Sequence, residues 1–377
     1  MSPKRLVSPL PPQPKTLLVG LYTPYNKLGD QEAYFAEFIS LVKTLGIEYE
    51  DTFFTKLRTI DKANFLTKGK LEALKQICEK DKYERLIFSE ILLPFQERNL
   101  EEILEVEIYD REKLILEIFK KSAHTAEGKL QVKIAEIEYL QSRIAGKGIE
   151  MSQQEGLIGT RGPGETAKEV IKRHYTEQIR RIHKKLKALE QSKRLQRKQR
   201  QSSKIPLICL VGYTNAGKST ILNQLTKSDV LVEDKLFATL DTTTRKYYFD
   251  GHKFLISDTV GFISDLPHHL IAAFKTTLEE LQDATLLLCV IDVSNKVWRN
   301  QIKIVLDTLQ EINVKKPILY LFNKIDKLSS IELENAKEKA KEFQPHIFIS
   351  AQHKTGLNQL LKYIKDFISL KSKQGAQ

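Results

Sequence analysis

One short segment of the chain, GYTNAGKST, matches the pattern G-x-x-x-x-G-K-S through four residues: Gly212, Gly217, Lys218 and Ser219. It directly follows the apolar run PLICLVG. In this pattern the backbone N–H groups of the loop cradle phosphates and the lysine neutralises the β and γ oxygens. The serine hydroxyl is a ligand for Mg²⁺. One match to so short a pattern can arise by chance, so the interpretation depends on companion motifs in a fixed order.

Three companion motifs follow, each at the end of an apolar, strand-like run. DTVG (258–261) ends KFLISD, so Asp258 can hold the water shell of Mg²⁺. NKID (323–326) ends PILYLF, and Asp326 can accept from N1–H and the 2-amino group of guanine, a donor pair that adenine lacks. SAQ (350–352) supplies backbone contacts to the base edge. Because ligands bind at the carboxyl ends of strands in open α/β sheets, the four motifs predict a GTPase domain.

The segment FATLDTTTR (237–245) lies where the first switch loop belongs, and a threonine there senses the γ-phosphate and ligates Mg²⁺. We expect this residue to be Thr239. The alternatives are Thr242, Thr243 and Thr244, some of which can also be ordinary turn or strand residues.

Phe262 follows DTVG at the position where a Ras-like enzyme carries a water-positioning glutamine. Since phenylalanine orients no water, we expect slow hydrolysis by the chain alone, completed by a partner or by other groups. Asn215 either helps to hold a monovalent cation such as K⁺ at the phosphates or only bonds to the switch backbone. We assign the catalytic roles to three residues: Lys218, Asn215 and Thr239.

Composition excludes several other classes of protein. The 377 residues predict two or three domains, and no apolar run approaches the roughly 18 residues that span a bilayer. The proline-broken N-terminus does not resemble a signal peptide. Three widely spaced cysteines lie in apolar runs, as is typical of buried thiols, and His268 and His269 are interpreted as surface residues. We expect a cytoplasmic protein without stable membrane insertion, with peripheral membrane attachment as an alternative location.

The net charge of +12 is concentrated in one segment. Residues 168–204 contain fourteen Lys and Arg against three acidic residues. A block of one sign favours a polyanion, and the absence of membrane features favours RNA over lipid. The expected RNA contacts in this block are Lys172, Arg173, Arg180, Arg181, Lys184 and Lys185.

The elements expected around these motifs fall into three parts. Strands at 15–22, 47–54, 85–93 and 106–110 alternate with helices at 31–46, 69–80, 96–104 and 113–123, which predicts a small parallel α/β domain. Heptad-like spacing in 127–144 and again from about 167 to 200 predicts an antiparallel helical hairpin, although such segments also form ordinary core helices.

The tip of the expected hairpin contains IGTRGPGETAKE (158–169), in a stretch that holds six of the seventeen glycines of the chain. It lacks a nucleotide-binding glycine pattern. We therefore interpret it as a tight turn that approaches folded RNA closely. The expected contacts in the turn are Arg161, Gly162, Pro163 and Gly164.

Together, GTRGPGET and the later motifs LVGYTNAGKST, FATLDTTTR, DTVGF and NKID resemble those of the HflX GTPases of the Obg–HflX class, and the resemblance covers nearly the whole chain. The resemblance implies a ribosome-associated GTPase that binds the large ribosomal subunit and its rRNA in the GTP form and splits or rescues stalled or idle ribosomes. It implies Mg²⁺ on Ser219 and Thr239, with Asp258 acting through water. The nucleotide contacts carried over by position are Gly212, Tyr213, Thr214, Asn215, Ala216, Gly217, Lys218, Ser219, Phe237, Ala238, Thr239, Leu240, Asp241, Asp258, Thr259, Val260, Gly261, Asn323, Lys324, Asp326, Ser350, Ala351 and Gln352.

The chain departs from the family pattern at Ala167 and Lys168, where Gln and Leu are usual, and at Thr242, where proline is usual. Since the sequence stops soon after the helix-like segment GLNQLLKYIKDFISL, we also expect the C-terminal extension of some relatives to be absent. We expect an α/β protein made of a small α/β N-terminal domain (1–122), a long antiparallel helical hairpin (123–204), a P-loop GTPase domain with a mostly parallel sheet (205–370) and a polar tail (371–377).

The expected protein is a monomer that binds no DNA. One alternative is an rRNA-binding scaffold or large-subunit assembly checkpoint in which GTP turnover is incidental. A separate ATP site in the N-terminal domain is a weaker idea, because that part of the chain has no phosphate loop.

Overall fold

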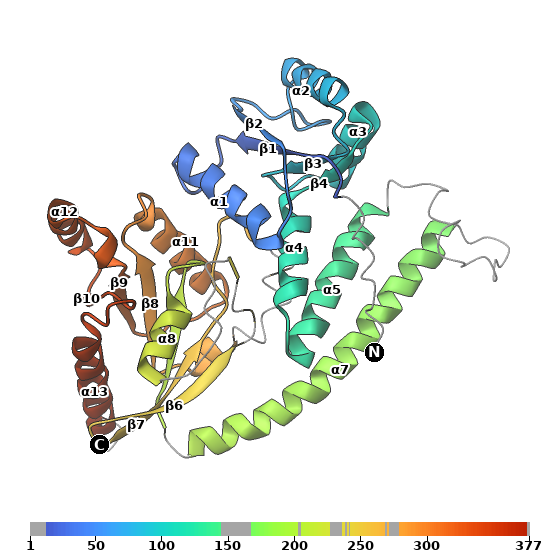
Figure 1. Ribbon diagram of the computed structural model, residues 1–377. Helices are drawn as coiled ribbons and strands as arrows, with labels where there is room; N and C mark the ends of the chain where they lie inside the picture. The colour runs from blue at the N-terminus through green and yellow to red at the C-terminus, as the bar shows by residue number, and fades with distance from the viewer. Residues whose placement is uncertain are drawn as a thin grey trace, which may run out of the picture.

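Figure 1 shows the computed structural model, which describes residues 13–144, 167–202, 205–226, 236–237, 240, 242–267, 270 and 279–374. Two sheets organise the chain. We call residues 13–122 the N-terminal region and residues 205–374 the G region. The long helix α7 (Ala167–Ser202) lies beside α5 (Ala126–Arg143), and its C-terminal end leads toward the G region (Figure 1).

The N-terminal region is a parallel sheet in the order β2-β1-β3-β4, as the alternating pattern predicts. Its elements are β1 (Thr16–Tyr22), α1 (Gln31–Leu45), β2 (Asp51–Lys56), α2 (Lys68–Asp81), β3 (Arg85–Phe88), α3 (Pro94–Leu104), β4 (Glu107–Tyr109) and α4 (Arg111–Ser122). Asp30 and Asp110 cap α1 and α4 by accepting from backbone N–H groups three residues ahead, at 2.8 Å in each case. These caps fix where both helices start.

Two predicted strands have different limits in the structure. The strand expected at 47–54 begins only at Asp51, because Glu50 turns its carboxylate back to accept from the backbone N–H of Thr16. The strand expected at 85–93 ends at Phe88. There the hydroxyl of Ser89 accepts from the N–H of Leu21 at 2.8 Å, and Pro94 starts α3.

The helices α5 (Ala126–Arg143) and α7 (Ala167–Ser202) contact each other and run in opposite directions (Figure 1). At 1.5 Å per residue the 36 residues of α7 extend about 54 Å. Residues 145–166, which contain the expected tip, lie outside the described residues, so the complete hairpin stays a prediction.

The G region is a six-stranded sheet in the order β10-β9-β8-β5-β7-β6, parallel except for β6, which is antiparallel to β7. Its elements are β5 (Leu207–Gly212), α8 (Lys218–Thr226), β6 (Thr243–Phe249), β7 (His252–Asp258), η1 (Glu279–Asp283), β8 (Leu286–Asp292), α11 (Trp298–Glu311), β9 (Ile318–Asn323), η2 (Ile325–Lys327), α12 (Ser330–Ala340), β10 (His346–Phe348) and α13 (Leu357–Gln374). This is the predicted mostly parallel P-loop architecture. The fold class is therefore confirmed.

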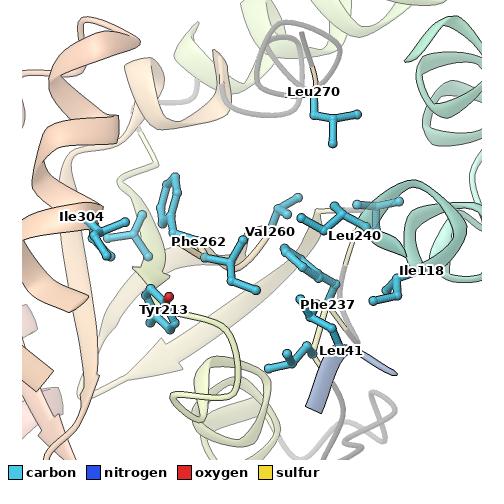
Figure 2. Close-up of a cluster of buried hydrophobic side chains, with 14 of the residues drawn as sticks. Leu41, Ile118, Tyr213, Phe237, Leu240, Val260, Phe262, Leu270 and Ile304 are labelled. Carbon is cyan, nitrogen blue, oxygen red and sulfur yellow. The ribbon is translucent and has the colours of Figure 1, made fainter. Parts of the chain in front are cut away.

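The two regions share a continuous hydrophobic core. In Figure 2, Leu41 and Ile118 from the N-terminal region lie beside Phe237 and Leu240. The rings of Phe119 and Phe237 meet edge to face with centroids 4.7 Å apart. Such burial favours one docked arrangement of the two regions.

The three cysteines are buried thiols, which confirms their interpretation. Burial raises the pKa of Cys78 to about 11. Within the described ranges, no helix combines the length and apolar character needed to cross a membrane.

Candidate functional site

The phosphate loop (residues 212–219) joins the carboxyl end of β5 to the start of α8, as the motif predicts. Two of its glycines have backbone conformations that side chains rarely adopt, with φ of 150° at Gly212 and 97° at Gly217. A Cβ at Gly212 would come within 2.3 Å of the carbonyl oxygen of Val290 on β8. The loop is therefore wedged against the neighbouring strand, with the N-terminus of α8 directed toward its centre.

Lys218 lies buried at the start of α8. Its Nζ donates to the carbonyl oxygens of Gly212 and Tyr213 at 3.2 and 2.8 Å. Desolvation lowers the pKa of Lys218 to about 8, against the opposing effect of the Asp258 carboxylate. An anion such as a phosphate would restore the ordinary preference for the charged form.

Ser219, the residue after Lys218, contacts Asp258 at the end of β7. The Ser219 hydroxyl donates to Oδ2 of Asp258 at 2.5 Å. Thr259 donates to the carbonyl oxygen of Leu210 at 2.7 Å and so holds the end of β7 beside β5. A hydroxyl and a carboxylate are oxygen donors of the kind that Mg²⁺ takes in partly hydrated sites, so this donor pair fits the predicted ion. Among the described residues no group of three or more His, Cys, Asp or Glu side chains forms a separate metal site.

Residues 258–264, which we call switch II, lie directly on the phosphate loop. The N–H of Thr214 donates to the carbonyl oxygen of Phe262 at 2.7 Å. The N–H of Phe262 donates to the carbonyl oxygen of Gly212 at 3.1 Å. The Phe262 side chain is buried in the shared core with Val260 (Figure 2). The residue at the glutamine position thus packs among hydrophobic side chains.

The two base-side motifs are joined to the phosphate loop through Asn323. Its Nδ2 donates to the carbonyl oxygen of Ala216 at 2.9 Å, and its Oδ1 accepts from the N–H of Ala351 at 3.0 Å. Ser350 donates to Oδ1 of Asp326 at 2.5 Å, which orients that carboxylate.

Lys324 adds a further link by donating to the carbonyl oxygen of Asn215 and to the Asp292 carboxylate, both at 2.8 Å. The structure therefore brings together the predicted residues of the phosphate loop, switch II, NKID and SAQ. Gln352 is exposed at the outer end of this group.

The first switch is only partly within the described residues. Ala238, Thr239 and Asp241 lie outside them, so the predicted Mg²⁺ ligand Thr239 stays a prediction. Phe237 and Leu240 are buried in the shared core, so a contact between them and a nucleotide would have to come from the backbone. Among the alternative threonines, Thr243 and Thr244 belong to β6, and the Thr244 hydroxyl lies 3.1 Å from that of Ser257.

Some of the predicted RNA-binding residues lie within the described residues and others lie outside them. The six basic side chains of α7 that were predicted to contact RNA are exposed: Lys172, Arg173, Arg180, Arg181, Lys184 and Lys185. Arg161, Gly162, Pro163 and Gly164 lie outside the described residues, as do His268 and His269. Ala167 and Lys168 begin α7.

Glu37 and Arg111 were missed by the sequence analysis. They reach the G region from α1 and α4, and Arg111 Nη2 donates to Oε1 of Glu37 at 2.5 Å. The Tyr213 hydroxyl donates to the other carboxylate oxygen of Glu37. A signal for Glu37 exists, because it falls on the buried stripe of α1 between Tyr34 and Leu41, where an unpartnered carboxylate would be costly.

A phosphate loop on a mostly parallel sheet, followed by an aspartate that meets the loop serine and a guanine-type NKxD motif, defines a P-loop GTPase. Three family models match: "GTP-binding GTPase N-terminal" over residues 32–120, "GTP-binding GTPase Middle Region" over 122–200 and "50S ribosome-binding GTPase" over 207–324.

Individual relatives agree with these matches. GTPase HflX of Caldanaerobacter subterraneus is 44% identical over 338 residues, covering 89% of this chain and 77% of that protein. GTPase HflX of Escherichia coli is 37% identical over 358 residues, covering 94% and 83%. The crystal structure of the SsGBP and GDP complex aligns with a TM-score of 0.50 at 25% identity, covering 95% of this chain and 99% of the other. The chain belongs to the HflX family of GTPases, and its ligand is a guanine nucleotide.

Proposed function

We propose that this GTPase binds the large ribosomal subunit through rRNA in its GTP form, and that hydrolysis releases it while stalled or idle ribosomes are split or rescued. The observation that carries the proposal is the exposed basic face of α7, with six cationic side chains along one helix. A surface of this kind is suited to the RNA phosphate backbone. The match to a family model described as a 50S ribosome-binding GTPase supports the choice of the large subunit.

The proposed nucleotide roles rest on the motif positions and are supported by the contacts of Lys218, Ser219 and Asp258. Lys218 neutralises the β- and γ-phosphates, and Asp326 recognises guanine. Ser219 and Thr239 ligate Mg²⁺, with Asp258 acting through water. The ion would supply charge neutralisation at the phosphates.

Asn215 helps to hold K⁺ beside the phosphates, which compensates for the buried Phe262. We further propose that residues 1–122, 123–204 and 205–370 form the three domains of a monomer. The 123–204 hairpin would present Arg161, Gly162, Pro163 and Gly164 to the rRNA.

Multiple-turnover GTP hydrolysis tests this function directly. Turnover should be slow for the chain alone and rise when purified large subunits are added, in buffers that vary only in K⁺ and Na⁺. Small subunits serve as the matched control. Equal turnover with and without large subunits across the whole K⁺ range would contradict the proposal.

The exposed face of α7 makes no described contact with the phosphate loop, which favours an RNA scaffold as the second candidate. A Lys218→Ala variant separates the two functions. The scaffold function predicts that this variant still binds large subunits as tightly as the wild type at every nucleotide condition. The GTP-dependent function predicts that this variant loses the tight binding to large subunits that GTP produces and keeps the weaker binding.

A further inference from the structure

Thr214, in the phosphate loop, carries a buried hydroxyl that has no hydrogen-bond partner within the part of the chain that the structure describes. The residue is 7% exposed. Its backbone N–H is engaged, because it donates to the carbonyl oxygen of Phe262 at 2.7 Å. A buried hydroxyl without a partner is costly, so it calls for an explanation such as a catalytic role or a bound ligand.

Three other hydroxyl groups beside the phosphate loop do have partners. Ser219 donates to the carboxylate at the end of β7, and Thr259 donates to a backbone carbonyl of β5. The Tyr213 hydroxyl donates to a carboxylate on α1. Thr214 therefore differs from these neighbours, because its hydroxyl is available to a substrate or to water.

The Thr214 side chain lies where the phosphate loop, Lys218 and switch II meet. A Cβ placed on Gly261 of switch II would come within 2.9 Å of Thr214 Cγ2 and 3.0 Å of Lys218 Nζ. The loop lysine binds the β- and γ-phosphates, and the γ-phosphate contacts the switches. The side chain of Thr214 therefore borders the place where the γ-phosphate binds.

A cavity of about 360 Å³ lies beside the phosphate loop and is lined in part by Thr214. Its walls also include Asn215 of the loop, Asp30 and Ser40 next to and on α1, and Gln301 of α11. One water takes up about 30 Å³ in the liquid, so the cavity has room for several waters among polar side chains. It therefore provides a store of water next to Thr214.

Hydrolysis of GTP needs a water that is held in line with the bond that breaks. A Ras-like enzyme holds this water with a glutamine, but Phe262 occupies that position here and is buried among hydrophobic side chains. The N–H of Phe262 is also engaged, because it donates to the carbonyl oxygen of Gly212 at 3.1 Å. A cation beside Asn215 would supply positive charge, which leaves the orientation of the water to another group. A threonine hydroxyl can accept a hydrogen bond from water and so perform this task.

We propose that Thr214 is a catalytic residue whose hydroxyl accepts a hydrogen bond from the attacking water and directs the water oxygen at the γ-phosphorus. This role goes beyond the phosphate-loop contact that the family resemblance gives to Thr214. In the reaction the water oxygen forms a bond to the γ-phosphorus. The bond from the γ-phosphorus to the bridging β–γ oxygen breaks, and its electron pair stays on GDP. One water proton remains on the attacking oxygen and the other passes to a γ-phosphate oxygen, so Thr214 keeps its own proton.

The experiment measures single-turnover GTP hydrolysis by the full chain, with the protein in excess and Mg²⁺ and K⁺ fixed. The dissociation constants of GDP and of a non-hydrolysable GTP analogue are measured separately. Thr214→Val keeps the branched shape and removes the hydroxyl. It should lower the single-turnover rate constant about tenfold or more, the loss expected for one hydrogen bond at a charged centre, and leave both dissociation constants unchanged. A rate constant equal to that of the wild type overturns the proposal.

A rescue variant and a matched control complete the test. Thr214→Ser restores a hydroxyl and should keep most of the wild-type rate, whereas a serine variant as slow as the valine variant overturns the proposal. Thr308→Val on α11 removes a hydroxyl that donates to the carbonyl oxygen of Ile304 at 2.8 Å within the same helix, and it should leave the rate unchanged. If Thr214→Val does not fold, Thr214→Ala takes its place, and a wild-type rate in that variant overturns the proposal.

Discussion

The side chain of Asn323 donates a 2.9 Å hydrogen bond to the carbonyl oxygen of Ala216, so the guanine-binding loop and the phosphate loop are one connected unit. Asn323 is 2% exposed and also accepts from the N–H of Ala351. Because this contact holds both loops in place without touching the nucleotide, it should support the binding of GTP and of GDP equally.

Replacing Asn323 with alanine leaves the carbonyl of Ala216 and the N–H of Ala351 buried without these bonds. Each unsatisfied group costs about 1–3 kcal/mol. We expect the affinities for GTP and GDP to fall together by about tenfold or more in a nucleotide titration. A loss confined to the triphosphate would contradict this explanation.

Asp326→Asn should change which base is bound. The carboxylate accepts from the N1–H and 2-amino groups of guanine, whereas an amide also presents donors, which suit the C2 carbonyl of xanthine. We expect GTP binding to weaken by about 3 kcal/mol, the loss expected for hydrogen bonds to a charged acceptor, and xanthosine triphosphate binding to improve. Competition titration measures both, with the exposed carboxylate variant Asp307→Asn as control. Unchanged base preference would exclude Asp326 as the reader of the base.

The parts of this site that were predicted from the sequence are those encoded locally. Alternation of strands and helices predicted the parallel sheet of the N-terminal region, and the loop motifs predicted the mostly parallel sheet of the G region and which of its strand ends converge. The predicted limits of the strands near Glu50 and Ser89 were wrong, because the side chains of these two residues form hydrogen bonds with the neighbouring strand β1. The contact of Glu37 with Ser264 joins residues 227 positions apart, and no local pattern specifies such a pairing.

Glu90 should make the stability of the N-terminal region depend on pH. Burial raises the pKa of Glu90 to about 7, although Tyr34 and Arg111 oppose this effect. The Tyr34 hydroxyl lies 2.6 Å from Oε1 of Glu90 and 2.8 Å from the carbonyl oxygen of Ser89. One hydroxyl proton cannot serve both acceptors, and a protonated Glu90 resolves this by donating to Tyr34.

Because the pKa of Glu90 is higher in the folded chain than in the unfolded chain, its contribution to stability is complete below about pH 4.5. That contribution is lost as the pH rises to about 7, and the change is about 3 kcal/mol. Urea unfolding at a series of pH values should show this decline in the wild type and a flatter profile in Glu90→Gln. Exposed Glu79→Gln should keep the decline. The same slope in Glu90→Gln and the wild type would show that another group titrates.

Charge reversal on α7 should weaken RNA binding in proportion to the number of RNA phosphates that the helix no longer neutralises. Arg173→Glu and Arg180→Glu alter exposed side chains, so the fold should be unaffected. The slope of log affinity against log salt should become shallower by about 0.7 to 0.9 for each such phosphate. Filter binding to large-subunit rRNA over a KCl series measures this slope. Lys337→Glu on α12 is the control, and a slope that reversal of α7 does not change would remove α7 from the interface.

Co-sedimentation with separated ribosomal subunits, carried out in a non-hydrolysable GTP analogue and in GDP, tests the central claim most directly. We expect the chain to sediment with the large subunit in the analogue, much less in GDP, and with the small subunit in neither. Lys218→Ala should lose the dependence on nucleotide. Equal sedimentation in both nucleotide states, or preference for the small subunit, would contradict it.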